Sequence, residues 1–336
     1  MPGETGLVYD RSHPVLAYVR DYVDCGRDPG TAAKEVRQVT ALTVRSSRNQ
    51  RLDWLQKFVF SLTFLATVVV CVPVAVVSVY VISHGASAIS WEFLFSGPAR
   101  AGREGGFFPV IVLTMYALLL VMLFAVPVGV LCSIYLAEYA QPGRLLRLIN
   151  LTIINLAGVP SIVYGLFGAA LFFDVIHTKQ ALWVASATLA MQALAIIITS
   201  SREALLSITP GIREGSLALG VSKLRTTFFI ALPEAFPGII TGSLLAVSRA
   251  AGETAPILIV GAIAATNVPL SPAAIVNDRP QMLSYELYYR ITEGLGLADE
   301  RKWGLALVLL GIVLVLNVSA LLLRIKIQSR GFEKRN

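Results

Sequence analysis

Residues 107–136 read FFPVIVLTMYALLLVMLFAVPVGVLCSIYL, thirty positions without a charged side chain. A helix of about 20 mostly apolar residues is long enough to cross the hydrocarbon core of a bilayer. Five further mostly apolar runs occur, at residues 58–83, 148–173, 181–199, 236–265 and 303–323. The sequence therefore predicts an all-α, polytopic helical membrane protein with six transmembrane helices.

The composition excludes several other classes of protein. Of the 336 residues, 55% are hydrophobic and only 15% are charged, whereas a soluble domain carries about 25% charged residues. Such an apolar excess rules out a soluble enzyme or a disordered chain. The three cysteines are few, odd in number and widely spaced, so a disulfide-rich secreted protein is excluded as well.

The distribution of basic residues predicts the orientation in the membrane. With six spans, both termini lie on one side, and the segments on that side hold twenty Lys and Arg residues against seven on the other. Because basic loops remain cytoplasmic, both termini are predicted to be cytoplasmic. Residues 1–57 then form a cytoplasmic N-terminal extension, 58–83 the first transmembrane helix and 326–336 a cytoplasmic tail. Topology accounts for the net charge of +7, so no nucleic-acid partner is expected.

The long outside loop, residues 266–303, has room for a helix from about residue 282 to 293. Its apolar and aromatic side chains, Leu283, Tyr285, Tyr288 and Tyr289, are available for packing. Two interpretations stay open: the loop contacts an external partner, or it forms a lid on the protein's own spans.

The cytoplasmic loop between the fourth and fifth spans carries a spaced motif. It reads Glu214-Gly215-Ser216, three residues, Gly220, nine residues, and then Ile230-Ala231-Leu232-Pro233. We expect a short helix after Pro210, a turn at Gly220, where positive φ is least unfavourable, and a second helix from Ser222 that ends near Leu232 and Pro233. Such a helical pair projects from the membrane; the alternative is an ordinary amphipathic hairpin.

A second motif lies in the third span, where residues 155–168 read NLAGVPSIVYGLFG. Three glycines and a proline weaken a helix and free backbone groups that need other partners. Interruptions of this kind often line a transport pathway, with Asn155, Ser161 and Tyr164 as candidate polar groups. Close packing of helices through the glycines is the alternative interpretation.

A third motif, residues 248–256, reads SRAAGETAP within the fifth span. Arg249 lies eleven residues after Gly238, or about 17 Å along a helix, which is close to the middle of the bilayer. An isolated Arg there costs roughly 2.5 to 3.5 kcal/mol, so intramembrane charges usually face a cavity. Glu253 follows at i+4 and can neutralise Arg249. The pair, with Thr254, is either part of a substrate path or a structural ion pair.

The spacing from Glu214 to Pro233 resembles the EAA loop of ABC importer permeases, with the two alanines replaced by Gly215 and Ser216. Together with residues 155–168, the YLAEY stretch at 135–139 and Arg249 to Pro256, it makes the chain similar to the A-type permease subunits of bacterial high-affinity phosphate importers (Pst). The similarity runs from about residue 105 to the last span.

The resemblance implies an ABC importer type-1 permease fold over residues 105–325, with a coupling loop at 203–235. It further implies a bacterial cytoplasmic (inner) membrane protein that moves inorganic phosphate. The implied partners are a second permease subunit in a heterodimer, two ATPase subunits and an extracytoplasmic phosphate-binding protein. The residues implied to couple to the ATPases are Glu214, Gly215, Ser216, Gly220, Ile230, Leu232 and Pro233. Those implied for the substrate path are Arg249, Glu253, Thr254, Asn155, Ser161 and Tyr164.

No GxxxxGK[ST] run occurs, so the chain is expected to bind no ATP and to be a transporter subunit rather than an enzyme, with ATP hydrolysed by the partner subunits. The three histidines show no metal-binding spacing, and no metal or other cofactor is expected. The alternatives are a permease for another oxyanion (sulfate, molybdate or a phosphonate), or a six-span membrane enzyme or passive channel.

Glu253 also suggests a basis for selectivity. Phosphate keeps a proton near neutral pH, and an ionised carboxylate can accept a hydrogen bond from it, whereas sulfate has no proton to donate.

Overall fold

The structure is a computed structural model that describes residues 50–100, 104–264, 272–293 and 298–333. The contacts within the chain divide it into two units, Met1–Val76 and Val77–Asn336. Most of the predicted N-terminal extension lies outside the described residues, so its fold stays a prediction.

In the first unit, the described residues belong to helix α3, which spans Gln50–Gly85 and continues into the second unit. The stretch Trp54–Ala88 is long and apolar enough to cross a membrane. The helix thus begins earlier than the predicted span, 58–83. The hydroxyl groups of Thr63 and Thr67 donate to carbonyl oxygens one turn earlier, which satisfies them in an apolar environment.

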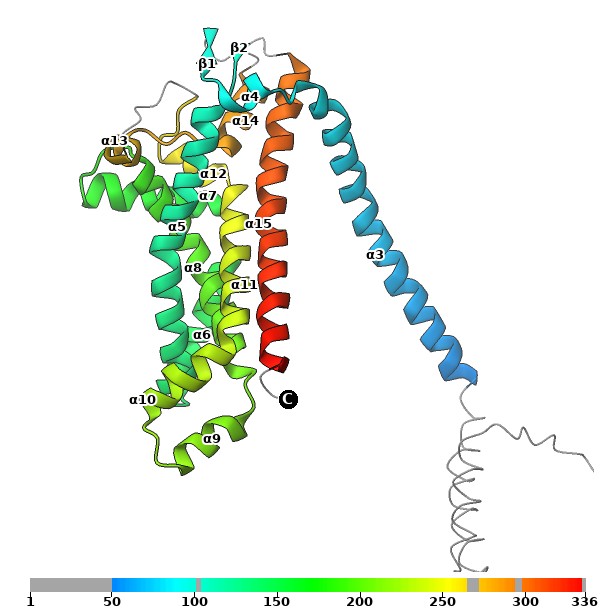
Figure 1. Ribbon diagram of the computed structural model, residues 1–336, viewed down its shortest axis with the longest axis vertical. Helices are drawn as coiled ribbons and strands as arrows, with labels where there is room; N and C mark the ends of the chain where they lie inside the picture. Colours follow the sequence, from blue (N-terminus) through cyan, green and yellow to red (C-terminus); the bar gives the residue numbers. More distant parts are fainter. Residues whose placement is uncertain (1–49, 101–103, 265–271, 294–297, 334–336) are drawn as a thin grey trace, which may run out of the picture. The chain divides into compact units, whose positions relative to one another are not determined.

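The second unit is built on a bundle of long helices (Figure 1). Its main members are α5 (Phe108–Ile134), α8 (Leu182–Leu206), α11 (Leu232–Ala251) and α15 (Asp299–Glu333). Small residues allow their close approach: a Cβ on Gly129 of α5 would lie 2.7 Å from Cγ2 of Ile197 in α8. Likewise, a Cβ on Gly242 of α11 would lie 2.0 Å from Oγ of Ser200. Helices in membranes associate through such contacts, because lipid offers no hydrophobic drive.

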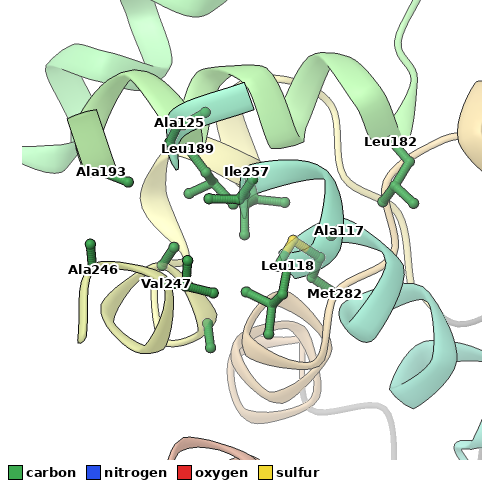
Figure 2. Packing of buried hydrophobic residues seen from close by; sticks show 14 of the residues in the cluster. Ala117, Leu118, Ala125, Leu182, Leu189, Ala193, Ala246, Val247, Ile257 and Met282 are labelled. Atoms are coloured by element: carbon green, nitrogen blue, oxygen red, sulfur yellow. The ribbon is translucent and has the colours of Figure 1, made fainter. Parts of the chain in front are cut away.

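The core of the bundle is formed by small and branched apolar side chains (Figure 2). Leu189 and Ala193 of α8 lie in one cluster with Ala125 of α5 and with Ala246 and Val247 of α11. The exposed apolar side chains of the helices complete the surface expected for lipid or a partner subunit.

Among the described residues, five helices are long and apolar enough to be spans, or up to six if one bent pair is counted as a single span. The bent pair lies at the predicted span 148–173, whose glycines and proline were expected to interrupt the helix. It consists of α6 (Arg144–Ala157) and α7 (Ser161–Ala169), which meet at 102°, and α7 continues into the π-helix η5 (Ala170–Val175). Pro160 precedes α7 and lacks the N–H that would continue α6, so the chain turns at this point.

The predicted span at 236–265 is also interrupted. Helix α11 ends at Ala251, and a short helix, α12 (Ala255–Ile259), begins after a three-residue break. Gly252 follows the end of α11 and Pro256 is the second residue of α12, positions that these residues commonly occupy at helix ends and beginnings. Residue 265 is outside the described residues.

The loop between the fourth and fifth predicted spans begins as predicted and ends differently. Helix α9 (Pro210–Ala218) is followed by a turn at Gly220, whose φ of 78° confirms the expected positive value. The second helix is α10 (Lys223–Thr226), which runs through the π-helix η6 (Thr227–Ala231) directly into α11. The prediction that it ends near Leu232 and Pro233 is wrong, because the wider π-turn before Leu232 accommodates a proline near the beginning of α11.

The other end of the bundle carries short elements (Figure 1). They are the 3-10 turn η2 (Ala86–Ala88), α4 (Trp91–Phe95), the antiparallel pair β1 (Pro98–Ala99) and β2 (Glu104–Gly105), α13 (Pro272–Asn277) and α14 (Leu283–Thr292). Pro98 pairs with Gly105 and Ala99 with Glu104. The helix predicted in the 266–303 loop is confirmed as α14.

Candidate functional site

Arg249 and Glu253 form an ion pair at the break between α11 and α12. Nε of Arg249 lies 3.5 Å from Oε1 of Glu253. The Arg side chain is 55% exposed, whereas that of Glu253 is 16% exposed. Arg249 lies in the last turn of α11, where a positive charge is favoured by the helix dipole. The guanidinium group is thus held by one long contact and keeps most of its donors available.

Glu253 is fixed by two further contacts from other helices. Nε2 of Gln192, in the middle of α8, donates to Oε1 of Glu253 over 2.7 Å. Oγ of Ser284 in α14 donates to the backbone carbonyl of Glu253 over 2.9 Å. The carbonyl oxygen of the Gln192 amide is buried without a partner. In this orientation the amide N–H of Gln192 faces a carboxylate oxygen that can accept it.

The two broken helices meet each other. A Cβ on Gly165 of α7 would lie 2.8 Å from the Cα of Pro256 in α12, and one on Gly168 would lie 2.4 Å from Oγ1 of Thr188 in α8. The motifs at 155–168 and 248–256 are therefore neighbours in space, although about 90 residues separate them in the sequence. The glycines of the 155–168 motif thus pack closely, as its alternative interpretation expected, whereas its role in a transport pathway stays a prediction.

Tyr164 stabilises the bend between α6 and α7. Its hydroxyl donates to the carbonyl oxygen of Leu156 over 2.8 Å, one of the carbonyls at the end of α6 that lack a helical partner. The Tyr164 side chain is buried, and its phenol lies within range of an electrostatic interaction with the Arg249 guanidinium group.

The remaining predicted path residues lie at helix boundaries. Asn155 is exposed near the end of α6, Ser161 is half-buried at the first position of α7, and Thr254 precedes α12. All three residues thus lie next to one of the two helix breaks. Their role in a substrate path stays a prediction.

Helix α14 covers the region of the ion pair from the end that carries the short elements. Leu283 is fully buried, and its backbone N–H donates to Oγ1 of Thr114 in α5 over 2.9 Å. Tyr285 belongs to the main core cluster. Burial raises the pKa of the Tyr285 phenol, and the neighbouring Tyr289 phenol and Glu286 carboxylate raise it further. The interpretation as a lid on the protein's own spans is thus supported for α14.

The loop around α9 exposes one face and buries another. Glu214 and Gly215 are exposed, Leu219 is 85% exposed, and a Cβ on Gly215 or Gly220 would meet no atom within 4 Å. This free face is small, partly apolar and acidic at one point, which suits docking against another protein.

The buried face of α9 packs on the bundle. Oγ of Ser216 and Oγ1 of Thr226 are hydrogen bonded at 2.9 Å. Ile212 and Leu232 lie against a cluster that includes Leu205 and Ala235. Ile230 is half-buried and Pro233 exposed at the transition into α11. The spaced motif therefore divides into an exposed part near Glu214 and a packing part near Leu232.

Sequence reasoning did not identify the two residues that contact Glu253 from other helices, Gln192 and Ser284. Gln192 had a detectable signal, because a polar side chain inside an apolar span usually has a function or a partner. Ser284 is an ordinary polar residue near the beginning of α14. In the described part of the chain, no three His, Cys, Asp or Glu residues gather in a way that could hold a metal ion.

Comparison with protein families finds one model that matches. Residues 125–330 match the family described as the binding-protein-dependent transport system inner membrane component. The chain is 31% identical over 266 residues to the "Phosphate transport system permease protein PstA 1" of Mycobacterium tuberculosis, covering 78% of this chain and 84% of that protein. It is 30% identical over 260 residues to the "Phosphate transport system permease protein PstA" of Mycobacterium leprae, covering 76% and 84% of the two chains.

Among solved structures, the fold is similar to that of a bacterial ABC transporter involved in the import of the acidic polysaccharide alginate. The TM-score is 0.52 at 12% identity, and the match covers 86% of this chain and 99% of that chain. At this identity the likeness concerns the fold alone, which is that of an ABC importer type-1 permease.

Proposed function

Because the chain belongs to the binding-protein-dependent transport system inner membrane component family, we propose that it is a permease subunit of an ATP-driven importer of inorganic phosphate. The relatives named as phosphate permeases support this substrate, since they match over more than three quarters of the chain. On this proposal the chain hydrolyses no ATP itself and acts with a second permease subunit, two ATPase subunits and an external phosphate-binding protein.

The single observation that carries the path is the exposed Arg249. Its side chain is 55% exposed on this subunit, on a helix long and apolar enough to cross the membrane. Contact of a guanidinium group with lipid would be unfavourable, by about 2.5 kcal/mol or more near the bilayer centre. The exposed side of Arg249 therefore faces a second permease subunit or a water-filled passage between the two, where it attracts an anion.

Glu253 and Gln192 set the geometry on the other side of the Arg. The amide of Gln192 donates to Oε1 of Glu253, and the guanidinium group forms an ion pair with the same oxygen. The carboxylate is thus oriented and can accept a hydrogen bond from a protonated phosphate. The helix breaks at Gly158 and Gly252 separate α6 from α7 and α11 from α12. On this proposal the two helices at each break move relative to each other during alternating access.

Coupling to ATP hydrolysis is assigned to the exposed face of α9. In this proposal Glu214, Gly215 and Gly220 contact an ATPase subunit on the cytoplasmic side, which also holds both termini. The absence of any atom near a Cβ on Gly215 supports a surface open to a partner.

The experiment that tests this function is uptake by a reconstituted complex. The chain is purified with its second permease and ATPase subunits, placed in vesicles with the binding protein outside, and supplied with labelled phosphate or sulfate. Phosphate uptake that requires ATP in the compartment facing α9 is the expected result. Preferential uptake of sulfate, molybdate or a phosphonate would assign the subunit to another oxyanion. Transport by the chain alone, without ATPase subunits, would contradict an importer.

A further inference from the structure

Arg213, directly before the exposed Glu214 in α9, makes four polar contacts with two other segments. Its Nε and Nη2 donate to Oε1 of Glu138 over 3.0 and 2.8 Å. Its Nη1 donates to the carbonyl oxygen of Ile208 over 3.1 Å, and Nη2 to that of Leu205 over 2.6 Å. The side chains of Arg213 and Glu138 are only 21% and 9% exposed.

Two of the partners of Arg213, Leu205 and Glu138, lie at the ends of long helices, and Ile208 follows α8 in the connection to α9. Leu205 belongs to the last turn of α8, whose carbonyl oxygens lack helical partners and are suited to a cationic donor. Glu138 lies in η4 (Tyr135–Tyr139), the π-helical turn that ends the span begun by α5. One guanidinium group thus joins α9 to the ends of the two helices that pack most extensively in the bundle, α5 and α8.

The same π-helical turn is held from the second half of the loop. Nζ of Lys223, the first residue of α10, lies 5.2 Å from the ring centroid of Tyr139, within the range of a cation–π contact. Adjacent residues of η4, Glu138 and Tyr139, therefore contact the two sides of the Gly220 turn. π-helical turns occur frequently at functional sites, and this one presents both residues to the loop.

The surroundings favour the transmission of movement along this connection. Two guanidinium donors that converge on one carboxylate oxygen restrict the direction of the contact as well as its distance. The pair lies beside an apolar cluster that includes Ile134, Leu205 and Ile208, so solvent screens it less than a surface pair. By contrast, the connection from α9 to α10 crosses a turn at Gly220 and one hydroxyl pair.

We propose that Arg213 is a positioning residue that passes the displacement of α9 to the ends of α5 and α8. The inference rests on the proposed function, because an ATPase subunit must move α9. A displacement of Glu214 by the ATPase is then carried by the adjacent Arg213 through Glu138 into α5, rather than being absorbed at Gly220. Removal of the pair uncouples hydrolysis from transport while the exposed docking face stays intact.

The test compares variants within the complete complex in vesicles. Arg213→Gln, Arg213→Lys and Glu138→Gln are each assembled with the other subunits, and uptake and ATP hydrolysis are measured together. The readout is the number of anions transported per ATP hydrolysed, which a merely structural role would not change. Arg144→Gln is the matched control, because Arg144 is an exposed cytoplasmic-side Arg at the first position of α6.

Arg213→Gln is expected to lower anions transported per ATP by about fivefold or more, the lower range of ordinary coupling between sites, while ATPase subunits still co-purify. Arg213→Lys keeps the charge but loses the planar set of donors. Its number of anions transported per ATP is expected to lie between those of the native complex and of Arg213→Gln. Glu138→Gln acts in the same direction, and Arg144→Gln leaves the ratio unchanged.

Two results would overturn the inference. One is a native ratio in both Arg213→Gln and Glu138→Gln, or uptake and hydrolysis that fall in proportion. The other is failure of all three variants to assemble, which would assign the pair to folding. If the native complex shows no ATP-driven phosphate uptake, the proposed function fails instead, and the ratio is measured with the anion that the complex does carry.

Discussion

The Arg213–Glu138 and Arg249–Glu253 pairs differ in how many donors of the guanidinium group are hydrogen bonded and in how exposed the arginine is. Arg213 donates to Glu138 and to two backbone carbonyl oxygens at distances of 2.6–3.1 Å, and its side chain is largely buried. Arg249 has one ion-pair contact at 3.5 Å and is 55% exposed. A satisfied, enclosed guanidinium group connects segments, whereas a loosely held, exposed one can exchange its contact for an incoming anion.

The two pairs also show how the same two residue types can have different roles in one chain. Arg249 and Glu253 come from one local segment, so their pairing requires no long-range packing. Arg213 and Glu138 are 75 residues apart, and their contact exists only when α9 is seated on the bundle. The first pair is suited to a site that changes during transport and the second to a connection that persists.

The largest expected effect is that of Arg249→Ala. Loss of the guanidinium group should lower ATP-dependent phosphate uptake by about 30-fold or more, which corresponds to about 2 kcal/mol, the effect of a hydrogen bond between charged groups. Arg249→Lys should give an intermediate rate, because the charge remains without its planar set of donors. Uptake is measured in vesicles with labelled phosphate, and co-purification of the ATPase subunits is the control for assembly.

Persistence of native uptake in Arg249→Ala would contradict the comparison. Arg249 would then be a structural ion-pair member like Arg213, and the substrate contacts would be sought around the bend at Gly158, near Asn155 and Ser161.

The second prediction concerns the anion that the pair selects. Glu253→Gln should raise sulfate uptake relative to phosphate by about tenfold, the equivalent of roughly one hydrogen bond. The carboxylate accepts a hydrogen bond from a protonated phosphate oxygen, whereas the amide of Gln can also donate a hydrogen bond to sulfate. The measurement is competition between the two labelled anions in the same vesicles. An unchanged ratio would show that selection is made elsewhere, for instance by the binding protein.

The sequence predicts the helical membrane fold well because apolar length is a local property. The six apolar runs correspond to five span-length helices and one bent pair. The positive φ at Gly220 and the helix α14 were likewise predictable from local composition.

What escaped prediction depends on how local breaks are resolved in three dimensions. Gly158 and Pro160 signalled a weak helix but not a bend of 102°. The end of α11 at Ala251 could have been inferred from Gly252 and Pro256, whereas the continuation through Pro233 depends on a π-helical turn that has no clear sequence signature.

The candidate site shows the same division. Arg249 and Glu253 are recognisable from sequence, since charge in an apolar span is unusual. Gln192 and Ser284 contact Glu253 from 61 and 31 residues away, and such pairings follow only from the packing of α8 and α14 against the break.

The third prediction sharpens the contrast by loosening Glu253. Gln192→Met keeps the size and shape of the side chain and removes the amide that donates to Oε1 of Glu253. Phosphate uptake should fall by about fivefold, which corresponds to about 1 kcal/mol, the net effect of a typical hydrogen bond. Ser284→Ala is the matched control, because it removes a contact with the backbone of Glu253 rather than its carboxylate; a decrease equal to that of Gln192→Met would indicate a general packing effect.

The smallest expected effect lies in the coupling loop beside the Arg213 pair. Ser216→Ala removes one member of a buried hydroxyl pair and leaves Thr226 without its side-chain partner, which should destabilise the loop by about 1 kcal/mol. Because neither hydroxyl carries charge and Arg213 still joins α9 to α5, anions transported per ATP should stay within about twofold of native, well below the usual coupling range. Thermal unfolding of the purified complex should reveal the lower stability, and Ser216→Ala with Thr226→Val should be less destabilising than the sum of the two single changes. A loss of coupling as large as in Arg213→Gln would mean that the hydroxyl pair, rather than the ion pair, carries the movement of α9.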